Sequence, residues 1–207
     1  MPHLCPICHH ESFAFYKDQF LQCPSCRAIW KPSHLFLSKS EEKKRYEQHH
    51  NNAQDPRYQE FVSPLTQSIE RDFPKSARGL DFGSGKSSSV SFVLRETGYT
   101  VAEYDLYFHY FPELLQTCYD FIACCEVIEH FQNPLREFWL LFGLLKNGGK
   151  LYCMTHIYNE SIDFANWYYK NDPTHVCIYQ KETLEYIQKV FWCKSLKITG
   201  RCIELSI

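Results

Sequence analysis

Four cysteines near the start of the chain have the type and spacing of metal ligands. They form two Cys-x-x-Cys pairs separated by 14 residues, so a short hairpin can bring four thiolates together as a tetrahedron. Four thiolates complete the coordination shell of zinc and leave no open position for chemistry, so we expect a structural zinc ion. Two neighbouring histidines are alternative ligands, and free or redox-active cysteines are the competing interpretation. The predicted ligands are Cys5, Cys8, Cys23 and Cys26, with His9 and His10 as the alternatives.

A second group of residues surrounds a turn between a predicted strand and a predicted helix. Gly83 and Gly85 allow backbone amides to come close to a ligand. A nicotinamide-binding fingerprint would need a third glycine where Ser88 stands. A phosphate-binding P-loop would need a glycine at Leu80, and the carboxylate of Asp81 would repel the phosphates. The acidic turn therefore favours a cationic cofactor.

The Asp-x-Gly-x-Gly sequence of this turn resembles motif I of the class I S-adenosylmethionine-dependent methyltransferases. The stretch Glu-Val-Ile-Glu-His, at 126–130, resembles the signature of small-molecule methyltransferases such as the quinone-biosynthesis group, and the combined resemblance covers about 130 residues from Ala77 onward. It implies S-adenosylmethionine as cofactor, with an acidic residue after the second strand on its ribose and Glu103 as the alternative to Asp105 there. Lys86 and Ser87 depart from the small residues usual in that loop. The cofactor-binding residues implied are Asp81, Gly83, Ser84, Gly85, Asp105, Leu106, Cys125 and Glu126.

Two histidines are candidates for chemistry on the methyl acceptor. His130 ends the stretch just described, and His175 ends an Asp-Pro-Thr-His element that resembles one in zinc-ribbon-bearing methyltransferases. The cysteine spacing also resembles the zinc-ribbon family, over about 30 residues. Because an imidazole accepts a proton near neutral pH, we assign both histidines, together with Asp172, as catalytic candidates that act as general base or orient the acceptor. Structural histidines with satisfied hydrogen bonds are the alternative.

The same residues allow a different mechanism. Glu126, Glu129, His130 and His175 also resemble the metal site of small-RNA 2′-O-methyltransferases, where a divalent cation would activate a ribose hydroxyl. The quinone-type enzymes share the Glu-Val-Ile-Glu-His stretch, and the chain is not basic. We therefore place methyl transfer to a small molecule, first of all to an oxygen, ahead of this alternative.

The elements that must position these residues alternate between strands and helices. Residues 77–83, 99–105, 119–125 and 149–156 are predicted strands, and a hairpin over 193–207 turns at Gly200. We expect an α/β fold: a Rossmann-like, doubly wound, mostly parallel sheet with a C-terminal antiparallel hairpin, plus a small N-terminal zinc ribbon. Helices are expected over 58–72, 88–98, 110–117, 133–149 and 181–191. The polar and charged segment from 38 to about 57 is expected to form an exposed connecting helix that ends before Pro56. The predicted domains are 1–37 (zinc ribbon), 38–75 (connecting helices) and 76–207 (methyltransferase domain).

A long aromatic segment separates the last parallel strand from the final helix. A stretch of this length without regular structure is usually a functional lid, and Trp167, Tyr168 and Tyr169 could shield the reaction from water. Plain packing of the segment against the sheet is the alternative.

Composition limits the possible functions. With 207 residues, 44% of them hydrophobic, the chain can bury one full core and a minor one. A net charge of -2 argues against general nucleic-acid binding, and no apolar run could span a bilayer, so we expect a cytoplasmic protein with a small-molecule acceptor. A non-catalytic zinc-ribbon adaptor and a nucleotide hydrolase are the functional alternatives. The sequence identifies neither the acceptor nor the oligomeric state.

Overall fold

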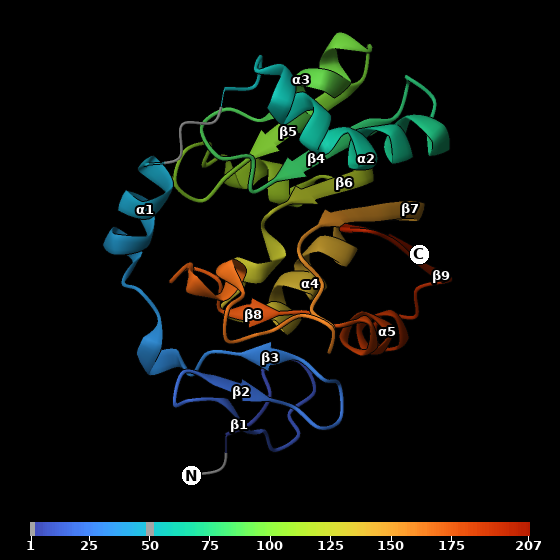
Figure 1. The fold of residues 1–207 in the computed structure, drawn as a ribbon. Helices are drawn as coiled ribbons and strands as arrows, with labels where there is room; N and C mark the ends of the chain where they lie inside the picture. Colours follow the sequence, from blue (N-terminus) through green and yellow to red (C-terminus); the bar gives the residue numbers. More distant parts are fainter. Residues whose placement is uncertain (1–2, 49–51) are drawn as a thin grey trace.

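The chain folds around one six-stranded sheet. The computed structural model describes residues 3–48 and 52–207. The sheet has the order β5-β4-β6-β7-β10-β9, in which β5, β4, β6 and β7 are parallel and β10 is antiparallel to both of its neighbours (Figure 1). This is the predicted Rossmann-like sheet with its C-terminal hairpin. The strands are β4 (Arg78–Phe82), β5 (Thr100–Tyr104), β6 (Tyr119–Cys125), β7 (Leu145–Met154), β9 (Ser195–Thr199) and β10 (Cys202–Ser206).

Helices cover both faces of this sheet. On one face, apolar side chains of α2 and α3 such as Leu65, Ile69 and Leu94 pack on Phe121 and Tyr152. On the other face, α4 and α5 belong to a larger apolar cluster. Burial on both faces explains why the central strands are almost continuously hydrophobic. The helices are α1 (Lys39–Glu47), α2 (Pro56–Asp72), α3 (Ser89–Glu96), α4 (Pro134–Gly143) and α5 (Lys181–Val190), and the 3-10 helices are η1 (Ser33–Leu35), η2 (Pro112–Gln116), η3 (Ile128–His130) and η4 (Tyr168–Asn171).

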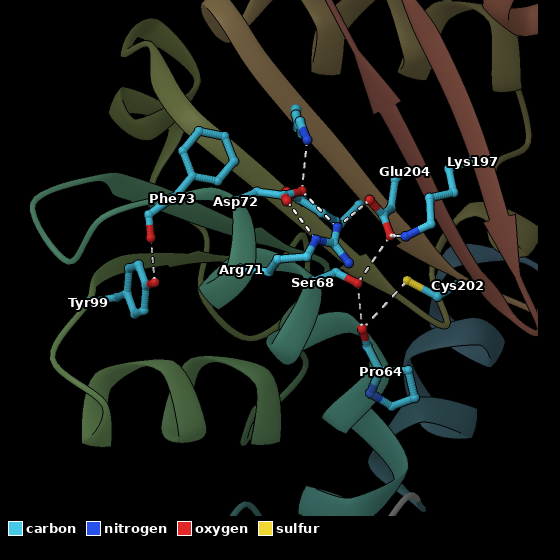
Figure 2. A network of polar contacts seen from close by, with 11 residues as sticks. Pro64, Ser68, Arg71, Asp72, Phe73, Tyr99, Lys197, Cys202 and Glu204 are labelled. Carbon is cyan, nitrogen blue, oxygen red and sulfur yellow. Dashed lines mark hydrogen bonds and ion pairs between the residues drawn. The ribbon is translucent and has the colours of Figure 1, made fainter.

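Ion pairs connect the end of α2 to the sheet (Figure 2). Glu204 of β10 accepts hydrogen bonds from Ser68 and Arg71 of α2, and Lys197 of β9 pairs with it at 3.1 Å. Asp72 accepts from Arg71 and from Tyr152 of β7. This network holds α2 in register with the antiparallel side of the sheet.

The N-terminal ribbon is not a self-contained module. Its sheet has the order β1-β2-β3-β8, and the fourth strand comes from a segment some 150 residues further along the chain. Phe20 and Ile29 of the ribbon share an apolar cluster with Phe164, Trp167 and Tyr169. The aromatic segment therefore packs mainly on the ribbon, which neither the lid nor the sheet-packing expectation anticipated. The strands are β1 (Phe13–Tyr16), β2 (Phe20–Gln22), β3 (Ile29–Trp30) and β8 (Cys177–Ile178).

The secondary structure differs from the expected one in three places. The connecting helix ends at Glu47, and Pro56 begins α2 instead of ending the preceding helix, because Asp55 caps the Arg57 amide and the fixed φ of proline suits the first helical turn. Residues 49–51 of the expected helix lie outside the described residues. The helix predicted over 133–149 ends at Gly143, since residues 145–148 already belong to β7. The 156–179 segment contains η4 and β8 and is therefore not structureless.

Among the described residues, no helix has the length and hydrophobicity required to cross a membrane.

Candidate active site

The glycine turn joins three strand ends at the carboxyl edge of the sheet. Gly83 and Gly85 have left-handed backbone, with φ of +78° and +63°. The amides of Gly83 and Ser84 donate to the carbonyl of Tyr104, which ends β5. A Cβ on Gly83 would lie 2.5 Å from the side chain of Val127, which follows β6, whereas a Cβ on Gly85 would meet nothing within 4 Å. The turn is thus packed against the sheet at Gly83 and open at Gly85, where a ligand has room.

Asp81 secures the start of α3. Its side chain is buried, and its Oδ2 accepts hydrogen bonds from the hydroxyls of Ser88 and Ser91. Burial raises the pKa of Asp81 to about 6, although the two serine hydroxyls oppose that shift. The carboxylate predicted to line the methionine part of the cofactor is therefore hydrogen-bonded to serines at the start of α3.

Asp105 orders the turn and the loop after β5. Its Oδ2 accepts from the amide of Gly85 at 3.0 Å, and its Oδ1 accepts from the amides of Tyr107 and Phe108 at 2.8 and 3.1 Å. Leu106 next to it is exposed. Lys86, which departs from the family pattern, lies 5.2 Å from the centroid of the Phe108 ring. The structure therefore brings together Gly85, Asp105 and Leu106, three of the residues assigned to the cofactor.

Glu126 follows β6 in a left-handed conformation, with φ of +54°. Its Oε2 accepts from Nη2 of Arg201 at 2.5 Å, and the Arg201 guanidinium lies over the ring of Phe61. Within the described part of the chain, Glu126 Oε1 is buried and has no hydrogen-bond partner. Burial raises the pKa of Glu126 to about 7, and the nearby Glu129 carboxylate adds to that effect. Glu126 is thus tied to the C-terminal hairpin.

Glu129, His130 and His175 converge beside it. Ligand atoms of the three side chains lie within 4.8 Å of one another. Glu129 is fully buried and accepts from the hydroxyls of Thr155 at 3.0 Å and Tyr169 at 2.5 Å. Burial raises the pKa of Glu129 to about 7. Three groups able to take up or release a proton are therefore held together, two from the segment after β6 and one from the loop before β8.

Both imidazoles have a fixed orientation. Nδ1 of His130 donates to the carbonyl of Thr174 at 3.0 Å, and Nδ1 of His175 donates to the carbonyl of Tyr169 at 2.7 Å. Because a carbonyl only accepts, each Nδ1 carries a proton and each Nε2 is the unprotonated nitrogen of the neutral ring, able to accept a hydrogen bond. Burial lowers the pKa of both rings, that of His175 to about 4, so both are neutral at pH 7.

Asp172 orders the loop that carries His175. Its carboxylate accepts from Arg45 of α1 at 2.7 Å and from the amide and hydroxyl of Thr174 at 3.0 and 2.6 Å. Burial opposes ionisation, but these hydrogen bonds outweigh it and hold the pKa of Asp172 well below its usual range. A carboxylate held this firmly in its charged form fits a positioning role better than proton transfer.

The four predicted zinc ligands also converge. Sγ of Cys5 lies 3.5 Å from that of Cys26, Sγ of Cys8 lies 3.3 Å from that of Cys23, and all four sulfurs lie within 4.8 Å of one another. Thiolates at about 2.3 Å around one tetrahedral zinc ion would have a similar mutual spacing. The donor set and its geometry therefore fit zinc.

Several residues around the site were not found by sequence reasoning. Thr155 directly follows β7, Arg201 lies in the last turn and Arg45 in the connecting helix, so each approaches from a different part of the chain. Tyr169 was expected to shield the reaction, and the structure adds a hydrogen bond from its hydroxyl to Glu129. Only the position of Thr155 at a strand end carried a usable signal, since ligands bind at that edge of a parallel sheet.

Comparison with known proteins identifies the family and the fold. A family model described as a methyltransferase domain matches residues 49–189. The fold is similar to that of magnesium protoporphyrin IX methyltransferase from Synechocystis PCC 6803 with bound SAH (16% identity, TM-score 0.57, 84% of this chain and 96% of that one). It is also similar to 1,6-didemethyltoxoflavin-N1-methyltransferase from Burkholderia thailandensis with bound 1,6-didemethyltoxoflavin and S-adenosylhomocysteine (9% identity, TM-score 0.57, 91% and 98%).

An O-methyltransferase family protein from Burkholderia thailandensis is a further structural neighbour (12% identity, TM-score 0.51), and the match covers 80% of this chain but only 61% of that protein. A search of curated proteins gave no match. The matched family region contains the glycine turn, Asp105 and the His130 and His175 loops. The chain therefore belongs to the methyltransferase domain family, and its sheet has the class I methyltransferase fold.

Proposed function

We propose that the chain transfers a methyl group from S-adenosylmethionine to a hydroxyl oxygen of a small-molecule acceptor. The observation that carries the proposal is the convergence of Glu129, His130 and His175 within 4.8 Å, at the edge of the sheet that also holds the glycine turn. A hydroxyl needs to lose its proton as it attacks, whereas the bound cofactor would supply an already activated methyl group. Both Nε2 atoms are poised to accept that proton, because the rings are neutral at pH 7.

The turn at Gly83, Ser84 and Gly85 and the carboxylate of Asp105 would hold the cofactor. The space beside Gly85, where a Cβ would meet nothing within 4 Å, fits a ligand placed close to the backbone. Leu106 would lie against the adenine and Cys125 and Glu126 would border the methionine part. Asp81 would also line the methionine part, while its Oδ2 supports the start of α3. A zinc ion on Cys5, Cys8, Cys23 and Cys26 would be structural, since four thiolates leave it no open position. The domain boundaries 37/38 and 75/76 remain part of this proposal.

Calorimetry with S-adenosylhomocysteine tests the cofactor assignment. We expect wild type to bind and Asp105→Ala to bind at least about tenfold more weakly, because both a ribose acceptor and the order of the turn are lost. Glu103→Ala is the matched control, since Glu103 lies two residues earlier, in β5, and pairs with Arg95 at 2.8 Å. No binding to wild type would refute the proposal and favour the adaptor alternative.

One observation favours a second candidate function, methylation assisted by a divalent cation. Two imidazole nitrogens and one carboxylate suit a transition metal. Metal ligands are usually oriented by hydrogen bonds from their other polar atoms, and here the Nδ1 atoms of both histidines and the Glu129 carboxylate make such bonds. Glu126 does not join this group, since Arg201 holds its carboxylate. Mn²⁺ titration of zinc-loaded protein, followed by electron paramagnetic resonance, separates the two. Binding that is lost in His175→Gln and kept in His156→Gln would support the metal-assisted route.

A further inference from the structure

The ribbon reaches the candidate active site through its last strand. Strand β3 pairs with β8, with Ile29 opposite Ile178 and Trp30 opposite Cys177. Lys31 follows β3 directly, and its amide donates to the carbonyl of Val176 at 2.9 Å. The backbone pairing thus continues from the zinc ribbon into the loop 172–176.

The side chain of Lys31 makes a second link. Lys31 is only 7% exposed, and its ammonium donates to the carbonyls of Asp172 at 2.9 Å and Pro173 at 3.3 Å. An ammonium group is costly to bury unless its protons have hydrogen-bond acceptors. The hydrogen bonds from Lys31 therefore hold these two carbonyls, and with them the loop, in place. Burial lowers the pKa of Lys31 to about 8, and the Asp172 carboxylate partly offsets that shift.

The loop held in this way sets the orientation of both catalytic candidates. His175 belongs to the loop, and the carbonyl of Thr174 accepts the Nδ1 proton of His130. The amide of Val176 donates to the carbonyl of Glu129 at 2.9 Å. A displacement of the loop therefore moves His175 directly and removes the partner that fixes the His130 ring.

We propose that Lys31 of the zinc ribbon is a positioning residue for His130 and His175, so that the ribbon forms part of the active site. The inference rests on the proposed function in that the two histidines face the acceptor. It predicts a defined change in the imidazoles when Lys31 loses its ammonium while the zinc site stays intact.

Lys31→Met tests this, because methionine retains an apolar side chain of similar length and removes the donor. Lys17→Met is the matched control, since Lys17 lies in the same ribbon but is exposed. The readout is the ring tautomer of His130 and His175 in long-range ¹H–¹⁵N spectra, assigned with His130→Gln and His175→Gln. Zinc content and S-adenosylhomocysteine affinity are measured on the same samples.

In wild type and Lys17→Met we expect the Nδ1-protonated tautomer at both rings. In Lys31→Met the ratio of the two tautomers should shift at least about tenfold toward Nε2 protonation, because Lys31 no longer holds the loop 172–176, which carries both the Thr174 carbonyl and the His175 ring. Zinc should remain at one ion per chain and the affinity for S-adenosylhomocysteine should change less than twofold. Lys31→Arg, which keeps a cationic donor, should restore most of the wild-type ratio.

Unchanged tautomers in Lys31→Met would overturn the proposal. If that variant does not fold, Lys31→Leu, which also removes the donor, gives the same readout, and unchanged tautomers in Lys31→Leu would overturn the proposal equally. Failure of wild type to bind S-adenosylhomocysteine would instead count against the proposed function and leave the tautomer result interpretable.

Discussion

Replacement of Gly83 by alanine should disrupt the cofactor turn far more than the same replacement at Gly85. Both glycines have positive φ, so an alanine at either position adopts a left-handed backbone. Only at Gly83 does the new Cβ also collide with a neighbour, because it would lie 2.5 and 2.8 Å from the two Cγ atoms of Val127. The pair therefore separates backbone strain from steric overlap within one turn.

The magnitudes follow from these two contributions. The left-handed backbone costs about 1–2 kcal/mol, and about 0.4–1 kcal/mol of that is offset by the smaller entropy of the unfolded chain. Overlap with a packed side chain adds about 1–3 kcal/mol. We expect Gly85→Ala to lower the free energy of unfolding by about 1 kcal/mol and Gly83→Ala by about 3 kcal/mol.

Urea unfolding followed by tryptophan fluorescence measures both values, and a double-mutant cycle isolates the overlap. Val127→Ala removes the colliding methyl groups, so Gly83→Ala combined with Val127→Ala should recover about 2 kcal/mol relative to the sum of the single effects. Val127→Ala should give no such recovery with Gly85→Ala. Equal losses at the two glycines, or no coupling between positions 83 and 127, would refute this account of the turn.

Three further predictions concern charge and metal. Burial raises the pKa of Asp81 to about 6, above its value in the unfolded chain, so the folded state binds the proton more tightly. The free energy of unfolding should therefore fall as the pH rises from about 4 to 6, and it should fall less in Asp81→Asn. If urea unfolding gives the same pH dependence for both proteins, this prediction is contradicted. Arg201→Met leaves Glu126 without its cation, and because these side chains are about 30% exposed we expect a loss of only about 1–3 kcal/mol at pH 8.5. That loss should shrink at pH 6, where a carboxyl group with a pKa of about 7 is protonated, and unfolding at both pH values checks it. Cys23→Ser should release zinc and lower the melting temperature of the whole chain in one transition, since the ribbon cysteines belong to the same apolar cluster as α4 and α5; the exposed Cys118→Ser is the control, and a separate early transition in calorimetry would argue for an independent ribbon.

Local sequence was sufficient for features that depend on short spacing. The two Cys-x-x-Cys pairs predict a four-sulfur site, and the sulfurs do converge. Strands alternating with helices predict a parallel sheet, because each helix returns the chain to the edge at which the previous strand began. Strands β5, β4, β6 and β7 are indeed parallel. The hairpin at Gly200 is likewise set by residues next to one another in the chain.

The tertiary structure decided which distant groups meet. Nothing in the sequence indicates that Cys177 and Ile178 complete the ribbon sheet, because a two-residue strand has no periodicity of its own and pairs only when its partner is already in place. Asp81 illustrates the same point, since its place after a strand predicts a cofactor contact, whereas only the fold shows that the hydroxyls of Ser88 and Ser91 also bind its Oδ2. Sequence spacing thus determined which chemical groups were available. Packing between segments far apart in the chain determined which of those groups lie in the site, because burial and hydrogen-bond geometry depend on neighbours that spacing alone does not specify.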